Sequence, residues 1–326
     1  MSNCCFCFKA SGGRAPLPYA IGEFVDNSLS ATKDNTSFGY DRKITITFSR
    51  ESLGHGVYED VLCIWDNGCG MHLQQMKEFA TYGLDPKRRG LREHIPSNYS
   101  EQEELFLNSR ISQFGVGSKQ AAFFIGDRFL LMTKPGDRQT VSELYMSKEE
   151  LNARWDERKN VYEDEVLYRR LGDYPQSRLN QVGFRGKWIR DHIAQEKNFE
   201  HFTSVIIGGI RESHVKSLLN NCDEICQDIC HVYHYYLHGT RGFRGGNLKK
   251  NASNVDIRLE VIENGHLKHS KNLSTFDQDL ESRYLKKQVS EFDFRLEKTD
   301  DRDQSKTLIV RVRLFTFIVY IDVQIG

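Results

Sequence analysis

Glu23 and Asn27 are the first residues in the chain whose types and spacing could do chemistry. They stand four positions apart in residues 17–32, where apolar residues recur at helical spacing. On a helix the two side chains share one face, and the apolar residues form the other. The carboxylate could take a proton from a water, and the amide oxygen is a hard ligand suited to Mg²⁺. Taken alone, the pair is better explained as a solvated polar face.

A second candidate group runs from Asp66 to Met71 and follows an apolar stretch, residues 60–65, that is typical of a strand. Gly68 and Gly70 allow the backbone to turn sharply and to approach a ligand closely. An Asp at the end of a buried strand can accept a hydrogen bond from an exocyclic amine. An ordinary Asp-Asn-Gly turn explains the same residues without a ligand.

A third group, Gly115, Val116, Gly117, Ser118 and Lys119, opens a helix expected over residues 116–125. Glycines at this position expose the free N–H groups of the first helical turn, which bind phosphate. A lysine in that turn opposes the helix dipole, and a bound phosphate would account for it. The spacing differs from the Walker A pattern and the group does not follow a strand as a Rossmann glycine motif does. A flexible hinge before a helix is the alternative.

The remaining pattern predicts an α+β fold able to position these groups. Residues 83–110 are irregular, and the highly charged stretch 147–170 favours a solvated insertion. A long helix is expected over 212–237, after which closely spaced glycines change the character of the chain. Strands are predicted at 43–48, 60–65, 128–134, 140–146, 203–208, 254–262 and 307–323.

Composition narrows the classes of protein. The chain has 326 residues, enough for two domains, and 39% of them are hydrophobic. Lys plus Arg equals Asp plus Glu at 45 each, so net charge gives no general attraction to nucleic acid or anionic membranes. No apolar run approaches the ~20 residues that a membrane helix needs. A soluble, non-membrane protein in a reducing compartment is expected.

The three groups, taken in order, resemble the GHKL ATPases. That family has a Bergerat-type α/β sandwich, with E-x-x-x-N on a helix, D-x-G-x-G after a strand, and a lid that ends in G-x-G. The resemblance implies ATP and Mg²⁺ as ligands, Glu23 as general base, Asn27 as the Mg²⁺ ligand and Asp66 as the reader of the adenine amine. It implies a lid over about 83–113, and it matches a family threonine to Thr203.

Within that family the chain resembles a chromosome-maintenance branch, with the Microrchidia ATPases as nearest relatives in kind. The residues that carry this are 13–27, 114–120, 201–203 and 231–236. The resemblance implies a GHKL domain over 1–210 and an incomplete, transducer-like, strand-rich domain over 211–326. It also implies a nuclear protein of gene silencing, homodimeric at full length, that reaches chromatin or nucleic acid through regions outside this chain, which would then be a fragment.

Cys222, Cys226 and Cys230 recur every four residues with histidines nearby. A zinc site is one interpretation. Zinc ligands usually converge from separate segments, whereas cysteines on one helical stripe pack as small hydrophobic side chains. Core packing is the prediction.

Two classes of function follow from these residues. One is a slow ATPase whose turnover is coupled to conformational change on chromatin. The other is a nucleotide-gated scaffold that binds ATP without useful turnover. Glu23 favours the first, since a decayed site has little need of a well-placed base. A histidine kinase fits less well, because no phosphoacceptor helix pair precedes the three groups.

Overall fold

The computed structural model describes most of the chain, in eight segments. These are residues 16–35, 39–80, 117–158, 165–238, 255–275, 288–299, 305–315 and 319–325. Gly115, Val116 and the expected lid at 83–113 lie outside the described residues.

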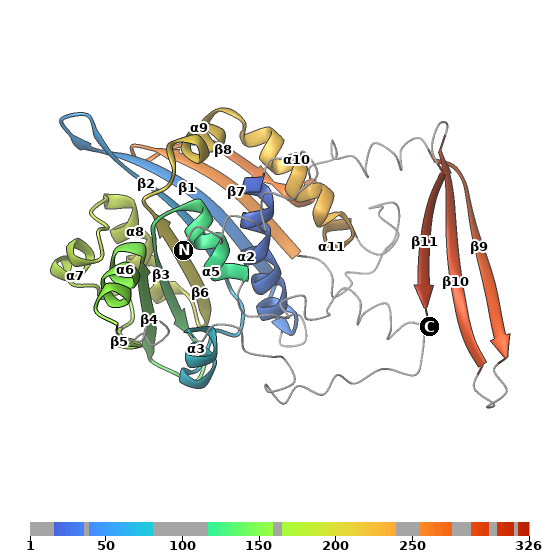
Figure 1. The fold of residues 1–326 in the computed structure, drawn as a ribbon, viewed down its shortest axis with the longest axis horizontal. Helices are drawn as coiled ribbons and strands as arrows, with labels where there is room; N and C mark the ends of the chain where they lie inside the picture. Colours follow the sequence, from blue (N-terminus) through green and yellow to red (C-terminus); the bar gives the residue numbers. More distant parts are fainter. Residues whose placement is uncertain are drawn as a thin grey trace.

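An eight-stranded sheet forms the centre of the molecule, in the order β5-β4-β3-β6-β2-β1-β7-β8 (Figure 1). Between residues 42 and 208, five strands of this sheet were expected from the sequence. All eight strands of the sheet are β1 (Arg42–Gly54), β2 (Val57–Asp66), β3 (Arg128–Lys134), β4 (Thr140–Ser147), β5 (Leu167–Arg170), β6 (Phe202–Gly208), β7 (Val255–Glu263) and β8 (His266–Asn272).

Neighbouring strands in this sheet are antiparallel, with one exception. β1 and β7 run parallel, with Arg42 opposite Val255 and Arg50 opposite Glu263. Two strands that lie about 200 residues apart in the sequence therefore pair side by side, next to the edge strand β8. The division expected near residue 210 stays a prediction, and strands on both sides of it pair in one sheet.

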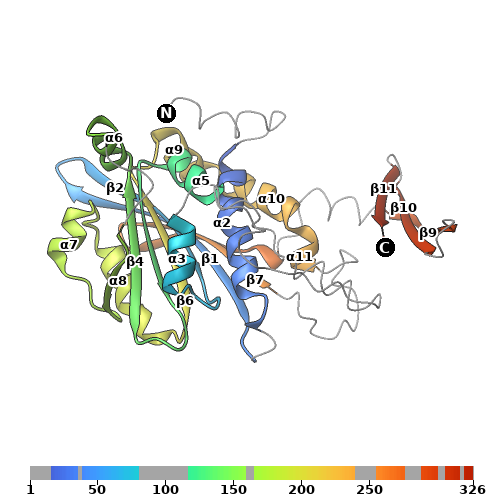
Figure 2. The ribbon, with the colours of Figure 1, turned by 60° about the horizontal axis from the view of Figure 1, so that its bottom comes forward.

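One face of the sheet is covered by helices α2 (Pro16–Thr32), α5 (Gly117–Ile125) and α10 (Cys222–Val232) (Figures 1 and 2). Alternate residues of the strands point to this face, as the two-residue period of a strand requires. In β2 they are Leu62 and Ile64, and in β6 they are Val205 and Ile207. The larger of the two hydrophobic clusters forms here.

The opposite face has a smaller cluster, covered by α7 (Gln176–Gln181) and α8 (Lys187–Gln195). The intervening residues of the same strands supply it, with Cys63 from β2 and Ile206 from β6. The sheet is thus buried on both faces over β2, β6 and β3, which explains why these strands are nearly continuous apolar runs.

The region after β6 differs from the expected single helix over 212–237. Three helices occupy it: α9 (Glu212–Asn220), α10 and α11 (His234–His238). The first break falls at Asn221, whose backbone leaves helical geometry and whose side chain donates to Glu224. Asparagine has a low helix propensity, which makes it a poor residue for a helix interior. The expectation of one helix is therefore wrong.

The charged stretch 147–170 is only partly a solvated insertion. Helix α6 (Lys148–Asp156) has no buried residues, as expected. Arg169 on β5, however, is buried. Three short elements complete the described part of the sheet region: α3 (Leu73–Ala80), η3 (Glu196–Asn198) and η4 (Leu273–Thr275).

A separate antiparallel sheet of three strands, in the order β11-β10-β9, lies at the C-terminal end of the chain. Its strands are β9 (Gln288–Thr299), β10 (Ser305–Phe315) and β11 (Val319–Ile325). The single strand-like stretch expected over 307–323 is thus two strands. Across the described residues, no helix is long and apolar enough to cross a membrane.

Candidate functional site

Helix α2 presents two chemically different faces. Ile21, Phe24 and Val25 are buried in the core beneath the helix, and Glu23 and Asn27 are half-buried on another side. Pro16 and Pro18 fall in the first turn, where a proline costs no helical hydrogen bond. The predicted amphipathic helix is confirmed, and the sheet fixes the direction in which its polar side chains point.

Asp66 ends β2 and is only 4% exposed. The Ser28 hydroxyl of α2 donates to its Oδ2 at 2.8 Å, and the Gly68 backbone N–H donates to its Oδ1 at 2.8 Å. Burial raises the pKa of the Asp66 carboxyl to about 7, although both hydrogen bonds oppose that shift. Neither partner carries a charge. The carboxylate is held in place but not neutralised.

Gly68 and Gly70 allow the chain after Asp66 to pass between α2 and β3. A Cβ at Gly68 would come within 2.5 Å of the Ala31 Cβ on α2. Gly70 has φ +69°, which favours glycine, and a Cβ there would overlap the Lys134 carbonyl. Both glycines of the D-x-G-x-G pattern are therefore required by close backbone packing.

Two threonines fix the floor beside Asp66. β6 lies between β2 and β3, and its Thr203 is opposite Asp66 of β2 on one side and opposite Thr133 of β3 on the other. The two threonine hydroxyls are 3.1 Å apart, and Thr133 Oγ1 accepts from the Met71 N–H at 2.9 Å. Sequence reasoning named Thr203 and Met71 but missed Thr133, which joins them.

His201 also contacts the glycine turn, and nothing in the sequence indicated this contact. Its Nδ1 lies 2.7 Å from the Gly68 carbonyl, so the chain before β6 also holds the glycine turn. Ser28 was missed as well. Its position beside Asn27 gives no local signal for its partner Asp66, which is 38 residues away.

The start of α5 lies directly against Glu23. A Cβ at Gly117 would overlap the Glu23 carboxylate, so any other residue there would have to displace the Glu23 side chain. Ser118 and Lys119 in the same turn are buried. Lys119 Nζ donates to the Phe79 carbonyl of α3 and lies 4.9 Å from the centre of that ring. In this structure Lys119 therefore tethers α3 to α5.

Burial also perturbs the carboxylates of α2. It raises the pKa of Glu23, and the neighbouring Asp26 raises it further. Burial raises the pKa of Asp26 too, opposed by a hydrogen bond from Tyr233. The Tyr233 hydroxyl donates to Asp26 Oδ1 at 2.7 Å and lies 2.8 Å from the Gly22 carbonyl. A carboxylate with a raised pKa is a stronger base, as proton abstraction requires.

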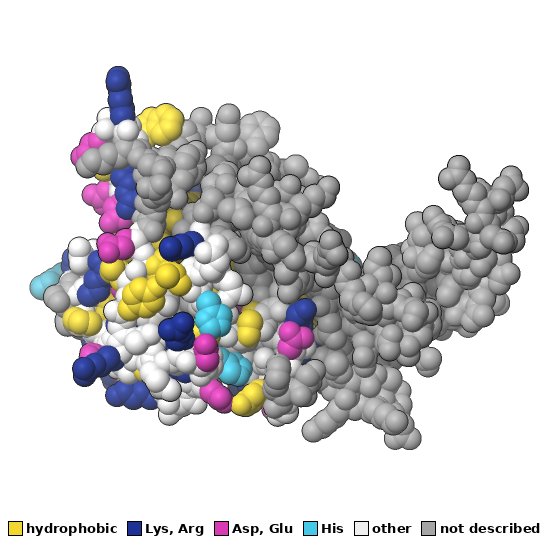
Figure 3. Space-filling model, turned by 90° about the horizontal axis from the view of Figure 1, so that it is seen from below, with side chains coloured by type: hydrophobic (Ala, Val, Ile, Leu, Met, Phe, Trp, Pro, Cys, Tyr) yellow, Lys and Arg dark blue, Asp and Glu magenta, His cyan; other side chains and the backbone are white. Residues whose placement is uncertain are grey.

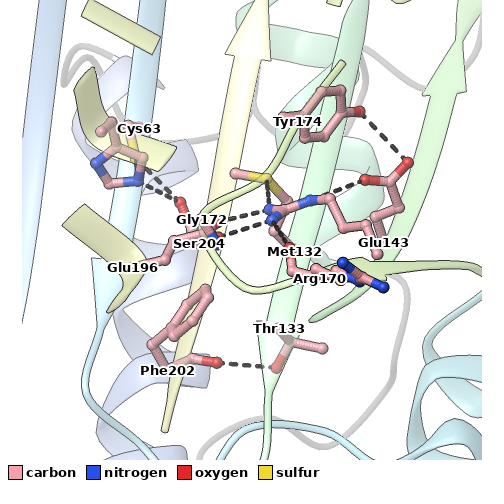
Figure 4. Close-up of polar contacts among 12 residues, drawn as sticks. Cys63, Met132, Thr133, Glu143, Arg170, Gly172, Tyr174, Glu196, Phe202 and Ser204 are labelled. Atoms are coloured by element: carbon pink, nitrogen blue, oxygen red, sulfur yellow. Dashed lines mark hydrogen bonds and ion pairs between the residues drawn. The ribbon is translucent and has the colours of Figure 1, made fainter. Parts of the chain in front are cut away.

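The opposite face of the sheet holds a buried ionic cluster of a different kind. Arg169 donates to both carboxylate oxygens of Glu196, at 2.7 and 2.6 Å, and its Nε lies 3.3 Å from Glu143. Figure 4 shows Glu143 also facing Tyr174, whose hydroxyl is 3.4 Å from it. These contacts hold β5, η3 and β4 together, so the cluster stabilises the fold.

Beside this cluster, His192 of α8 contacts Ser204 at 3.0 Å and Cys63 at 3.7 Å. Burial, with the nearby Arg169 charge, lowers the pKa of His192 to about 4, so the ring is neutral at pH 7. A cavity of about 610 Å³ opens next to it between α8 and the sheet, with Trp65, Trp188 and Phe199 in its wall.

The surface seen from below carries Lys and Arg, Asp and Glu, and His side chains in mixture over the described residues (Figure 3). Among the described residues visible there, no broad field of one charge stands out. This agrees with the balanced charge of the whole chain.

Residues 16–166 match the family model described as histidine kinase-, DNA gyrase B-, and HSP90-like ATPase. Glu23, Asp66 and Gly117 all lie within that range. The chain thus belongs, through this region, to the GHKL ATPases, and its α+β fold agrees with that family. Membership supports ATP binding.

Among curated proteins, the chain is similar to the structural maintenance of chromosomes flexible hinge domain-containing protein 1 of Homo sapiens and of Mus musculus. Each is 32% identical over 294 residues, or 88% of this chain. The chain spans 14% of the length of these relatives. The solved ATPase and transducer domains of DNA topoisomerase II from Balamuthia mandrillaris align with 92% of this chain and 56% of their own, at 13% identity and a TM-score of 0.35. At this identity and TM-score, the alignment supports no conclusion about function.

Proposed function

We propose that this chain binds Mg-ATP along α2 and hydrolyses it slowly, with turnover coupled to a conformational change or dimerisation in a chromosome-maintenance protein. The observation that carries the proposal is the contact between the Glu23 carboxylate and Gly117. It sets a carboxylate of raised pKa against the first turn of a helix, where free N–H groups favour phosphate.

Asp66 serves the other end of the nucleotide. Its carboxylate accepts from the exocyclic amine of adenine, while Ser28 and Gly68 hold it in position. Ser28 and Glu23 are five residues apart on α2, or about 7.5 Å along a helix axis. The helix therefore spaces the base-reading carboxylate from the phosphate end of the site. Gly68, Gly70, Met71 and Thr203 form the turn and floor between them.

At the phosphate end, Gly117, Ser118 and Lys119 bind the triphosphate, together with Gly115 and Val116. Lys119 must leave the Phe79 carbonyl to do so, and α3 is then released from α5. Glu23 takes the proton of the attacking water at a carboxylate oxygen. The Asn27 amide oxygen suits Mg²⁺, which when bound neutralises phosphate charge.

The wider role is proposed from the relatives. Their name places them with the maintenance of chromosomes, and we extend this to a nuclear, chromatin-associated protein that acts in gene silencing. GHKL ATPases often dimerise, and we propose a homodimer at full length. Chromatin or nucleic acid would be reached through regions outside this chain.

A nucleotide-gated scaffold without useful turnover is the second candidate. The Lys119 contact with Phe79 favours it, because a phosphate-binding lysine engaged elsewhere slows each cycle of binding. A Microrchidia-like ATPase would use the same residues. The two candidates differ in whether Glu23 contributes to a chemical step.

Glu23→Ala and Asn27→Ala separate binding from turnover. Loss of a general base costs ~10²–10⁴ in rate, so Glu23→Ala is expected to bind ATP near wild-type affinity and to lose hydrolysis. Asn27→Ala is expected to lose Mg²⁺-dependent binding as well. Calorimetry measures binding, and phosphate release measures turnover.

The exposed Glu212→Ala is the control, and each variant's melting temperature is checked first. A folded Glu23→Ala protein that hydrolyses ATP at the wild-type rate would remove Glu23 as the base. Wild-type protein that binds ATP but releases no phosphate would support the scaffold.

A further inference from the structure

Two cysteines and a histidine from different elements meet where α10 passes β8. Cys222 and Cys226 lie one turn apart on α10, and His269 lies on β8. The two sulfurs and a ring nitrogen of His269 all lie within 4.8 Å of one another. The cysteines are 6% and 0% exposed, and His269 is partly exposed.

The spacing of the cysteines could not show that His269 lies beside them. The prediction of core packing is confirmed, since Cys222, Cys226 and Cys230 are all buried in the larger cluster. The objection to a metal site was that three cysteines on one helix do not bring ligands from separate segments. His269 comes from a segment 43 residues after Cys226 and supplies such a ligand.

One ring nitrogen of His269 lacks a hydrogen bond. Its Nε2 is buried and has no hydrogen-bond partner among the described residues. The nearest carboxylate oxygen, Asp223 Oδ1, is 3.4 Å away. A buried polar atom without a partner destabilises the folded state. A metal ion bound by this nitrogen would satisfy it.

The ligand chemistry suits zinc. Two thiolates and an imidazole form a borderline-soft set, and a carboxylate is an accepted fourth ligand. Tetrahedral zinc, with bonds of about 2.3 Å to sulfur and 2.0–2.1 Å to nitrogen, places its ligand atoms roughly 3.5–3.8 Å apart. Side-chain rotations that bring the three atoms about 1 Å closer together are enough to complete the site.

The charges around the group also balance. Zinc and two thiolates are neutral together, and the two thiol protons pass to solvent on binding. Asp223 adds one negative charge, and Lys271 Nζ lies 3.4 Å from the same Asp223 oxygen. No unpaired charge is left in the partly buried site.

We propose that Cys222, Cys226 and His269, with Asp223 as the fourth ligand, form a structural zinc site that ties α10 to β8. Lys271 positions the Asp223 carboxylate. The third cysteine, Cys230, has another partner, because its thiol donates to the Leu273 carbonyl of η4 at 3.6 Å.

The zinc site would brace the helix that carries Glu23. α10 packs against α2, and Tyr233, which follows α10 directly, donates to Asp26 on α2. Zinc binding to this group does not depend on nucleotide binding, so its test is independent of the proposed ATPase activity.

Metal content tests the proposal on the 326-residue chain, kept reduced throughout. The chain is loaded with zinc, dialysed against metal-free buffer and measured by mass spectrometry of the metal. The expected result is one zinc per chain for wild type and for Cys230→Ser, and none for Cys222→Ser or Cys226→Ser. Cys230→Ser is the matched control, since it removes a buried thiol from the same helix stripe.

Cobalt and chelation give readouts that survive a folding defect in the cysteine variants. Wild type with Co²⁺ should show thiolate-to-cobalt absorption, which His269→Ala changes in intensity and Cys230→Ser keeps. His269→Ala should weaken zinc binding by roughly 100-fold or more, and Lys271→Met by about 10-fold. A strong chelator should lower the melting temperature of wild type only when zinc is present.

Wild type that retains no zinc and shows no thiolate-to-cobalt absorption would overturn the proposal. So would a Cys222–Cys226 disulfide in freshly reduced, zinc-loaded protein, or equal zinc affinity in wild type and His269→Ala.

Discussion

Asp66 on one face of the sheet and Glu196 on the other are both almost fully buried, and they differ in what faces their charge. Glu196 accepts two hydrogen bonds from the Arg169 guanidinium. Asp66 accepts from a hydroxyl and a backbone N–H, both neutral. A buried carboxylate with a matched arginine is part of the packing. A buried carboxylate left without one keeps a raised pKa, and such groups are more frequent in functional sites.

Removing the arginine should have the largest effect. Arg169→Met leaves Glu196 buried without its cation, and breaking a buried pair costs about 3–5 kcal/mol. Urea denaturation should show a loss of that size in the free energy of unfolding. The control is Arg178→Met, since Arg178 is more exposed and lies 3.6 Å from Glu143. Equal losses in the two variants would contradict a special role for the Arg169 pair.

The uncompensated charge of Asp66 should appear as a dependence of stability on pH. Its folded pKa, about 7, lies above the unfolded value of about 4. The stability it contributes is fully present below pH ~4 and is lost as pH rises through ~7. Without nucleotide, Asp66→Asn should become more stable than wild type by up to about 4 kcal/mol above that pH. Urea titrations from acidic to mildly alkaline pH measure the difference, and a constant difference would mean that Asp66 is neutralised by a group in the folded protein.

Nucleotide affinity should fall by a smaller free energy in Asp66→Ala. A hydrogen bond to a charged group contributes about 1.5–3 kcal/mol, which is roughly 10–150-fold in affinity. Calorimetry with ATP should show that loss. GTP, which has a carbonyl oxygen in place of the 6-amino group of adenine, should bind wild type and the variant equally weakly. Unchanged ATP affinity would place adenine elsewhere.

Ser28→Ala should have the smallest effect. It removes one hydrogen bond that favours the charged form of Asp66, so the pH at which stability is lost should move upward. The expected change in stability at neutral pH is about 0.5–1.5 kcal/mol. The same urea titrations measure it, and a midpoint that moves downward would show that Ser28 does not donate to Asp66 in solution.

The contrast between the two faces also marks what the sequence could predict. Glu23, Asp66 and Gly68 could be predicted as site residues because each lies in a short pattern whose chemistry is local. Arg169 was assigned to a solvated stretch because its charge is visible in sequence and its partner, 27 residues later, is not.

The fold shows the same division. The strands at 128–134 and 140–147 were predicted closely, since alternation and a turn specify a hairpin. The helix at 212–237 was predicted as one element because apolar spacing continues across Asn221, where the backbone leaves helical geometry. The contacts of Ser28, Thr133 and His269 were not predicted either. Like the partner of Arg169, their partners come from segments that are distant in the sequence.

The parallel pairing of β1 with β7 has a consequence for how the chain is made. Residues 42–50 cannot complete their second ladder of hydrogen bonds until residues 255–263 have been synthesised. At about 5–20 residues per second, the roughly 200 residues between them take about 10–40 s to translate. During that interval one edge of β1 has no partner strand, and such non-local contacts slow folding. A nascent chain at this stage presents an apolar, unpaired edge, so chaperone contact during translation should concentrate between the release of β6 and the release of β7.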